Sequence, residues 1–157
     1  MIRDPYDLFV SRYYYLQNQA TRFKREQDPR RLVIGKPLDH PDVLWYQAHK
    51  FGNVLKKAND WVGSGHSIVG RYEDLHRDPV AELTRVTSLI RPVATADIAR
   101  AVEVCSAENM RKLNPDMSKH VRSATVGDSR QRRGPAHLAV FREHHADAIR
   151  SLGYEVR

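Results

Sequence analysis

Apolar residues recur along the chain with the spacing of amphipathic helices, and the first such pattern begins almost at the N-terminus. Asp4 followed by Pro5 is typical of a helix N-cap and its first helical residue, and Asp7 stands where a capping box places its acid. The apolar positions that follow form one face: Tyr6, Phe9, Val10, Tyr13 and Leu16. We therefore predict a helix that begins at Pro5 and buries this face.

The most regular helical pattern spans residues 42 to about 62. Its buried face is expected to consist of Leu44, Ala48, Phe51, Leu55, Ala58 and Trp61. His49 lies off this face and is expected to meet water. Between the two helices, residues 21–42 lose the apolar period and carry Lys and Arg interleaved with Pro and Gly, which predicts a long surface connection.

Further helices are predicted after Asp78, over residues 96–105, over residues 107–113 with Ser106 as the cap, and from Pro135 to Gly153. Cys105 is expected to point inward as a small buried side chain. Residues 67–72 follow a Gly-Ser-Gly break and form a short apolar run, which predicts a buried strand. Helices thus dominate the predicted structure.

Length and composition fit one soluble globular domain. The 157 residues suffice for a single core, and 41% hydrophobic with 29% charged residues is typical of a folded protein. No apolar run is long enough for a membrane span, and the first residues lack a signal-peptide pattern, so we expect a cytoplasmic protein. One cysteine excludes an internal disulfide, and the adjacent His144 and His145 cannot form a helical metal pair, so no metal site is expected.

A candidate anion site lies at the start of the first helix. Arg3 stands just before the cap, and Ser11 lies two turns into the helix and off its apolar face. Together with free backbone N–H groups they could hold an anion, because the N-terminus of a helix favours negative charge. In the alternative interpretation, Arg3 is a solvated charge and Ser11 an ordinary surface residue.

The segment from Arg3 to Tyr15 resembles the 3′-phosphate-binding segment of sulfotransferases that use 3′-phosphoadenosine-5′-phosphosulfate (PAPS). The resemblance implies that Arg3 and Ser11 contact the 3′-phosphate. A second segment, Tyr72 to Pro79, resembles the Tyr-Glu-Asp-Leu…Asp-Pro segment of the same family, where the tyrosine lies against the adenine. This implies the same role for Tyr72, whereas the alternative is a tyrosine that only packs.

Two weaker resemblances follow in the same order. Residues 105–110 resemble an adenine-contacting segment of the family, which implies a contact from Ser106, although Ala107 stands where the family has an aromatic ring. Residues 120–130 resemble the loop that folds over the nucleotide, which implies 3′-phosphate contacts from Arg122 and the backbone at Gly127. Here the alternative is a solvated basic loop.

The resemblance implies an α/β fold, the P-loop-NTPase-like fold of sulfotransferases, in one partial domain over residues 1–157. In the family, the segment like Arg3 to Tyr15 lies midway along the domain. We therefore expect a truncated, mostly helical back half with one or two parallel strands. Neither the lysine-bearing loop for the 5′-phosphosulfate nor the family's histidine base has a match here, so no catalytic residue is assigned and the chain alone is expected to be inactive.

The function implied is transfer of a sulfuryl group from PAPS to a hydroxyl or amine of a small-molecule or glycan acceptor. In the family, the region like residues 21–42 lies near the acceptor. The alternative function is a non-catalytic basic module for nucleic acid or another polyanion, consistent with the net charge of +7 and the arginine-rich loops 21–36 and 122–133. No recognised nucleic-acid motif supports it. A nucleotide kinase is disfavoured without a Walker lysine loop, and the oligomeric state stays open.

Overall fold

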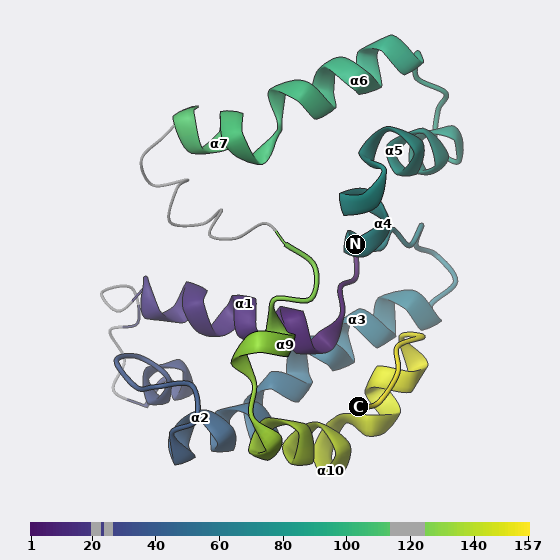
Figure 1. Cartoon of the computed structure of the whole chain (residues 1–157). Coiled ribbons are helices and arrows are strands. Elements are labelled where there is room, and N and C mark those ends of the chain that lie inside the picture. The colour runs from purple at the N-terminus through teal and green to yellow at the C-terminus, as the bar shows by residue number, and fades with distance from the viewer. Residues whose placement is uncertain (20–22, 24–26, 114–124) are drawn as a thin grey trace. The chain divides into compact units, whose positions relative to one another are not determined.

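The computed structural model describes residues 1–19, 23, 27–113 and 125–157. Its chain forms two compact units (Figure 1), each built from segments distant in sequence. Unit 1 comprises Met1–Arg3 and Ile68–Val126, and unit 2 comprises Asp4–Ser67 and Gly127–Arg157. The first three residues therefore belong to one unit, and the helix that follows them belongs to the other.

Unit 2 begins with helix α1, Pro5–Gln17, which forms as the sequence predicts. The Asp4 carboxylate caps it by accepting hydrogen bonds from the backbone N–H of Tyr6 at 2.9 Å and of Asp7 at 3.3 Å. All five apolar positions of the predicted face are buried. The helix start and its packing face are thus confirmed.

The predicted helix over residues 42–62 is interrupted by a π-helical segment. It consists of α2, Pro41–Tyr46, then the π-helix η3, Gln47–Phe51, and then α3, Gly52–Gly63. A π-helical turn holds one residue more than an α-turn and rotates the buried face. Before the segment, Val43 and Tyr46 are therefore buried rather than Leu44. Trp61 lies in the last turn of α3 and is 68% exposed. The prediction of Trp61 as a core residue is therefore wrong, whereas Phe51 and Leu55 are buried as expected.

The rest of unit 2 closes over this core. The 3₁₀-helix η2, Pro29–Leu32, lies within the predicted long connection, and α9, Ser129–Arg132, precedes the last helix α10, Pro135–Ser151. α10 packs against α2, η3 and α3 and buries Phe141, His145 and Ile149. Gly153 follows with a positive φ of 75°, as expected for a glycine that ends a helix.

Unit 1 is a chain of four short helices: α4, Tyr72–Arg77, α5, Pro79–Ser88, α6, Thr95–Val104, and α7, Ala107–Leu113. Consecutive helices contact one another, and Asp78 caps α5 as predicted. Among its described residues the buried side chains are Ile2, Glu82 and Ile98. Cys105 is exposed, which corrects the expectation that it points inward; it follows the last residue of α6, and the neighbouring Val104 is exposed as well.

The predicted strand over residues 67–72 does not form. Among the described residues, this segment makes one isolated parallel bridge, between Ile2 and Arg71. The backbone N–H of Ile2 donates to Gly70 O at 2.9 Å, and the N–H of Tyr72 donates to Ile2 O at 2.8 Å. The pairing stops there because helices begin at Pro5 and at Tyr72. The one or two parallel strands and the P-loop-like fold expected from the resemblance are therefore not shown by the described residues.

The mostly helical character of the chain is confirmed by this arrangement. None of the helices in the described part is both long and apolar enough to cross a membrane.

Candidate functional site

The parallel bridge in unit 1 brings Arg3 and Tyr72 together. Each residue directly follows one partner of the bridge, Ile2 or Arg71. The Arg3 guanidinium lies over the tyrosine ring, with Cζ 4.2 Å from the ring centroid. This distance is within the range of a favourable cation–π contact. Two residues to which the sequence assigns neighbouring roles are therefore neighbours in space.

The hydrogen bonds of Arg3 leave part of its guanidinium unused. Nη2 donates to the carbonyl oxygen of Thr125 at 3.0 Å. Nε is buried and has no hydrogen-bond partner among the described residues. A guanidinium carries five N–H donors in a fixed fork that matches a phosphate group. The chemistry of this pair, a cation beside an aromatic ring, therefore fits a ligand with a phosphate and a planar base.

Ser106 caps helix α7. Its hydroxyl oxygen accepts a hydrogen bond from the backbone N–H of Asn109 at 3.3 Å, and its carbonyl oxygen accepts one from Met110 at 2.8 Å. The predicted capping role is confirmed. The adenine contact implied by the resemblance stays a prediction.

Ser11 and Gly127 belong to unit 2. Ser11 is half-buried on α1. Gly127 has a φ of 84°, a conformation that a residue with a side chain rarely adopts. The structure therefore gives Gly127 a conformational reason to be glycine, and its phosphate contact stays a prediction. Arg122, the other loop residue assigned to the phosphate, lies outside the described residues.

The Asp7 carboxylate holds the start of this loop. Oδ2 accepts a hydrogen bond from the backbone N–H of Gly127 at 2.6 Å, and Oδ1 accepts one from Ser129 N–H at 2.9 Å. Asp7 is buried, so both bonds are shielded from water. The sequence suggested only a capping-box role for Asp7. No local pattern could reveal a contact that spans 120 positions of the chain.

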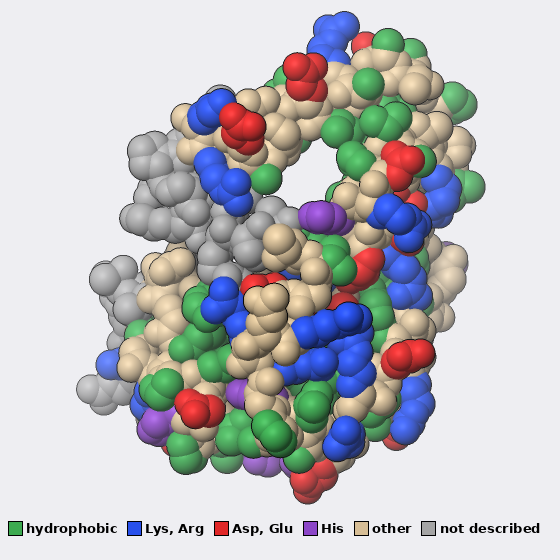
Figure 2. All heavy atoms as spheres, in the orientation of Figure 1, with side chains coloured by type: hydrophobic (Ala, Val, Ile, Leu, Met, Phe, Trp, Pro, Cys, Tyr) green, Lys and Arg blue, Asp and Glu red, His purple; other side chains and the backbone are tan. Residues whose placement is uncertain are grey.

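The sequence also gave no indication of a cluster of arginines in unit 2. The guanidinium carbons of Arg133 and Arg157 lie 4.6 and 5.0 Å from the centroid of the Tyr6 ring. Arg157 pairs with Asp4 at 2.7 Å, whereas burial and the nearby Arg157 lower the pKa of Arg133. Figure 2 shows Lys and Arg side chains gathered between α9 and the C-terminus. The cluster joins residues far apart in sequence, so spacing gave no signal for it.

The predicted site residues are thus divided between the units. Arg3, Tyr72 and Ser106 lie in unit 1, and Ser11 and Gly127 lie in unit 2. Within unit 1, the structure brings Arg3 and Tyr72 into direct contact. No group of three or more His, Cys, Asp or Glu side chains in the described part of the chain could hold a metal ion.

Comparison with known families assigns the chain to a class of enzymes. The family model described as "Sulfotransferase domain" matches residues 1–153. The chain therefore belongs to the sulfotransferase domain family, and this membership indicates sulfuryl-transfer chemistry. No curated protein and no solved structure shows a significant match to the chain.

Proposed function

We propose that this chain binds the 3′-phosphate and adenine side of PAPS for sulfuryl transfer to a hydroxyl or amine acceptor. In that reaction the bond from sulfur to the 5′-phosphate oxygen breaks, and a bond from sulfur to the acceptor oxygen or nitrogen forms. The acceptor releases its proton, and 3′-phosphoadenosine-5′-phosphate is the second product.

The contact between Arg3 and Tyr72 carries this proposal. Arg3 offers a guanidinium whose Nε has no hydrogen-bond partner among the described residues, and the tyrosine offers a ring for a base. Both residues stand at positions that resemble the nucleotide-binding segments of the family whose model matches the chain. Ser11, Ser106, Arg122 and Gly127 are proposed as further nucleotide contacts.

The motifs that the sequence lacks bear on what the chain does by itself. The 157 residues contain no match to the lysine-bearing loop that would hold the 5′-phosphosulfate, nor a histidine at the position of the family's base. Stabilising charge at the leaving phosphate is the main catalytic requirement of such a transfer. We therefore propose that the chain alone binds the nucleotide without turning it over.

Calorimetric titration of the full chain with 3′-phosphoadenosine-5′-phosphate tests the proposal. Saturable binding is expected, at least tenfold weaker for Arg3→Ala and for Ser11→Ala, because each removes a donor from the phosphate. ADP, which lacks the 3′-phosphate, should bind more weakly than the probe and respond little to either change.

Arg77→Ala is the matched control. Arg77 is an exposed arginine of α4 in an ion pair with Asp74, so its removal changes the net charge equally. Equal weakening by Arg77→Ala, or equal affinity for ADP and the 3′-phosphorylated probe, would mean that the binding is general attraction to a basic protein.

A further inference from the structure

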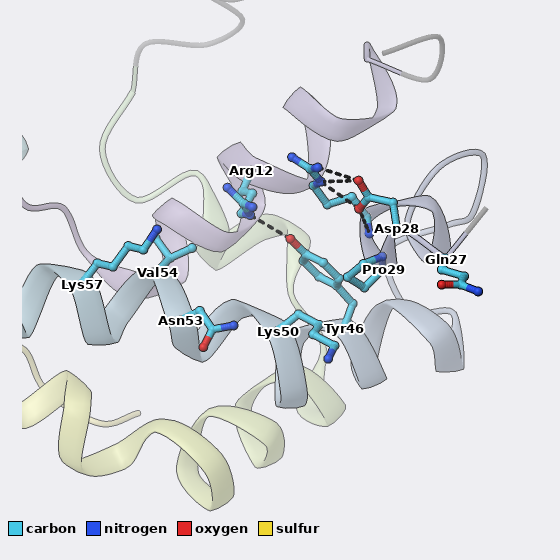
Figure 3. Close-up of a pocket in the computed structure, with 10 residues that line it drawn as sticks. Arg12, Gln27, Asp28, Pro29, Tyr46, Lys50, Asn53, Val54 and Lys57 are labelled. Carbon is cyan, nitrogen blue, oxygen red and sulfur yellow. Dashed lines mark hydrogen bonds and ion pairs between the residues drawn. The ribbon is translucent and has the colours of Figure 1, made fainter. Parts of the chain in front are cut away.

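Unit 2 contains a basic hollow outside the predicted nucleotide residues. It has a volume of about 860 Å³ and lies between α1, the segment that leads into η2, and the helices η3 and α3. Figure 3 shows side chains from all of these elements around it. Its lining residues include four cations, Arg12, Arg30, Lys50 and Lys57, and one acid, Asp28. Its size is typical of a ligand pocket.

A second hollow of about 420 Å³ continues the first. The two share Gln27, Asp28, Pro29 and Lys50 in their linings. The second adds two cations, Arg31 and Lys36, and the half-exposed Trp45. We call the two hollows together, lined by residues 12, 27–32, 36, 45, 46, 50, 53, 54 and 57, the basic groove.

Part of the positive charge in the basic groove is already neutralised. Arg30 is paired with Asp28 through bonds of 2.5 to 3.1 Å, and Lys36 is paired with Asp42. The Arg12 guanidinium is oriented by a 2.9 Å bond from Nε to the Tyr46 hydroxyl.

Within the described part of the chain, the remaining cations of the groove have no such partner. Arg31, Lys50 and Lys57 form no ion pair with any residue that the structure describes. With Arg12, which bonds to a neutral hydroxyl, they leave an excess of positive charge along the groove. A negatively charged ligand would therefore be favoured there.

The arrangement of these cations fits an elongated ligand. Lys50 and Lys57 stand seven positions apart along consecutive helical segments, roughly 10 Å at 1.5 Å per residue. A compact anion is held by donors that converge on one point, and here the cations are spread out instead. Trp45 adds an exposed ring beside Lys50, whose Nζ lies 5.4 Å from the ring centroid. The groove thus combines spaced cations with an aromatic platform.

We propose that the basic groove binds an acidic oligosaccharide that carries carboxylate or sulfate groups along its length. Spaced cations match its repeating charges, and the Trp45 ring can pack against the apolar face of a sugar ring. As the acceptor, such a chain would supply hydroxyl or amine groups; this last step rests on the proposed sulfotransferase function, whereas the binding itself does not.

Calorimetric titration of the full chain with a sulfated tetrasaccharide of uronic acid and glucosamine tests the inference. We expect saturable binding, at least tenfold weaker in the double variant Lys50→Gln, Lys57→Gln. In this variant the slope of log Kd against log salt concentration should decrease by one to two, because fewer counterions are released. A neutral N-acetylglucosamine tetramer should not bind measurably.

The control variant is Lys56→Gln, Arg150→Gln. Both residues are exposed, lie in unit 2 outside the groove and carry the same total charge as Lys50 and Lys57. Its affinity should stay within twofold of that of the unmodified chain. Equal weakening in both double variants, absence of binding, or equal binding of the neutral tetramer would overturn the inference.

Two further titrations separate this inference from other outcomes. Tighter binding of a DNA oligonucleotide than of the tetrasaccharide, lost in the Lys50, Lys57 variant, would make nucleic acid the ligand and overturn the glycan. Titration with 3′-phosphoadenosine-5′-phosphate tests the proposed function in the same samples. If the unmodified chain binds the nucleotide but not the tetrasaccharide, only the inference about the groove is contradicted. If it binds the tetrasaccharide but not the nucleotide, only the proposed nucleotide site is contradicted.

Discussion

The guanidinium of Arg3 lies 4.2 Å above the ring of Tyr72, and both side chains are held there by backbone hydrogen bonds around one parallel bridge. The bridge holds the backbone of the two residues side by side within unit 1. Arg3 covers one face of the ring, so a planar base would approach the other face or the edge. Substitution of Tyr72 therefore removes the stacking surface and leaves the charge of Arg3 in place.

Substitution of Tyr72 should weaken nucleotide binding through loss of the ring. For Tyr72→Leu we expect an affinity for 3′-phosphoadenosine-5′-phosphate reduced about tenfold, since stacking on an aromatic side chain contributes about 1–3 kcal/mol per base. Tyr72→Phe keeps the ring and should stay within about threefold. Calorimetric titration measures both. If Tyr72→Leu binds as tightly as Tyr72→Phe, the ring has no part in binding.

Asp7→Asn should destabilise unit 2 by about 1–3 kcal/mol. In the unmodified chain, each carboxylate oxygen of Asp7 accepts a bond from a backbone N–H. The asparagine keeps one acceptor oxygen, and its NH₂ group faces the other N–H, which loses its acceptor. A buried donor without a partner is costly. Urea unfolding followed by circular dichroism measures the change in the free energy of unfolding. In the variant, hydrogen exchange should accelerate more at the amides of Gly127 and Ser129 than elsewhere in the unit.

Asp147→Asn provides the comparison for Asp7→Asn. Asp147 is fully exposed on α10 and pairs with Arg150 on the same helix, a contact that contributes little to stability. Its effect on unfolding should remain within about 0.5 kcal/mol. Equal effects of the two substitutions would mean that the loop amides find other acceptors when Asp7 is changed.

Two buried histidines should make the stability of unit 2 depend on pH. His137 and His145 bond to the side chain and the carbonyl oxygen of Gln47, each at 2.7 Å. Burial lowers the pKa of both rings below the ordinary 6.5. The unfolded chain therefore binds more protons than the folded one between the folded pKa and 6.5. Stability is fully present above pH 6.5 and falls as the pH drops below it.

The size of this effect follows from the number of histidines. Each can remove up to about 1.4 kcal/mol per pH unit below 6.5, until the folded protein itself is protonated. Urea unfolding at pH 7.5, 6.5 and 5.5 measures the dependence. His145→Gln should reduce it, whereas His144→Gln, at an exposed position, should leave it unchanged. A wild-type stability that does not fall between pH 6.5 and 5.5 would contradict the assignment of neutral buried rings.

The parts of the fold that the sequence predicts well depend on local signals. Helix α1 is predicted in full because its cap, its proline and its apolar face all lie within a short stretch. The π-helix is missed because packing determines it: a Cβ on Gly52 would lie 3.2 Å from the His145 ring, so α10 approaches the backbone closely at the end of this segment. Periodicity alone cannot register such a long-range contact.

In the candidate site, too, the residues predicted from the sequence are those that belong to local motifs. The resemblance assigns Arg3 and Tyr72 to two parts of one nucleotide, and the structure places the two side chains in contact. By contrast, Asp7 and the basic groove depend on how distant segments fold together. Arg31 and Lys36 belong to the basic connection that the sequence already indicated, whereas their position beside Lys50 and Lys57 depends on the fold.

The unequal burial of Phe51 and Trp61 gives a direct test of the packing in unit 2. Phe51 is fully buried against Phe9 and Phe141, with ring centroids 5.2 and 6.1 Å away, whereas Trp61 is 68% exposed. Phe51→Ala should therefore cost about 3–5 kcal/mol in unfolding free energy. Trp61→Gln should change it by less than about 0.5 kcal/mol. Urea unfolding of the two variants measures this difference, and a loss of similar size in both would contradict the burial of Phe51 and the exposure of Trp61.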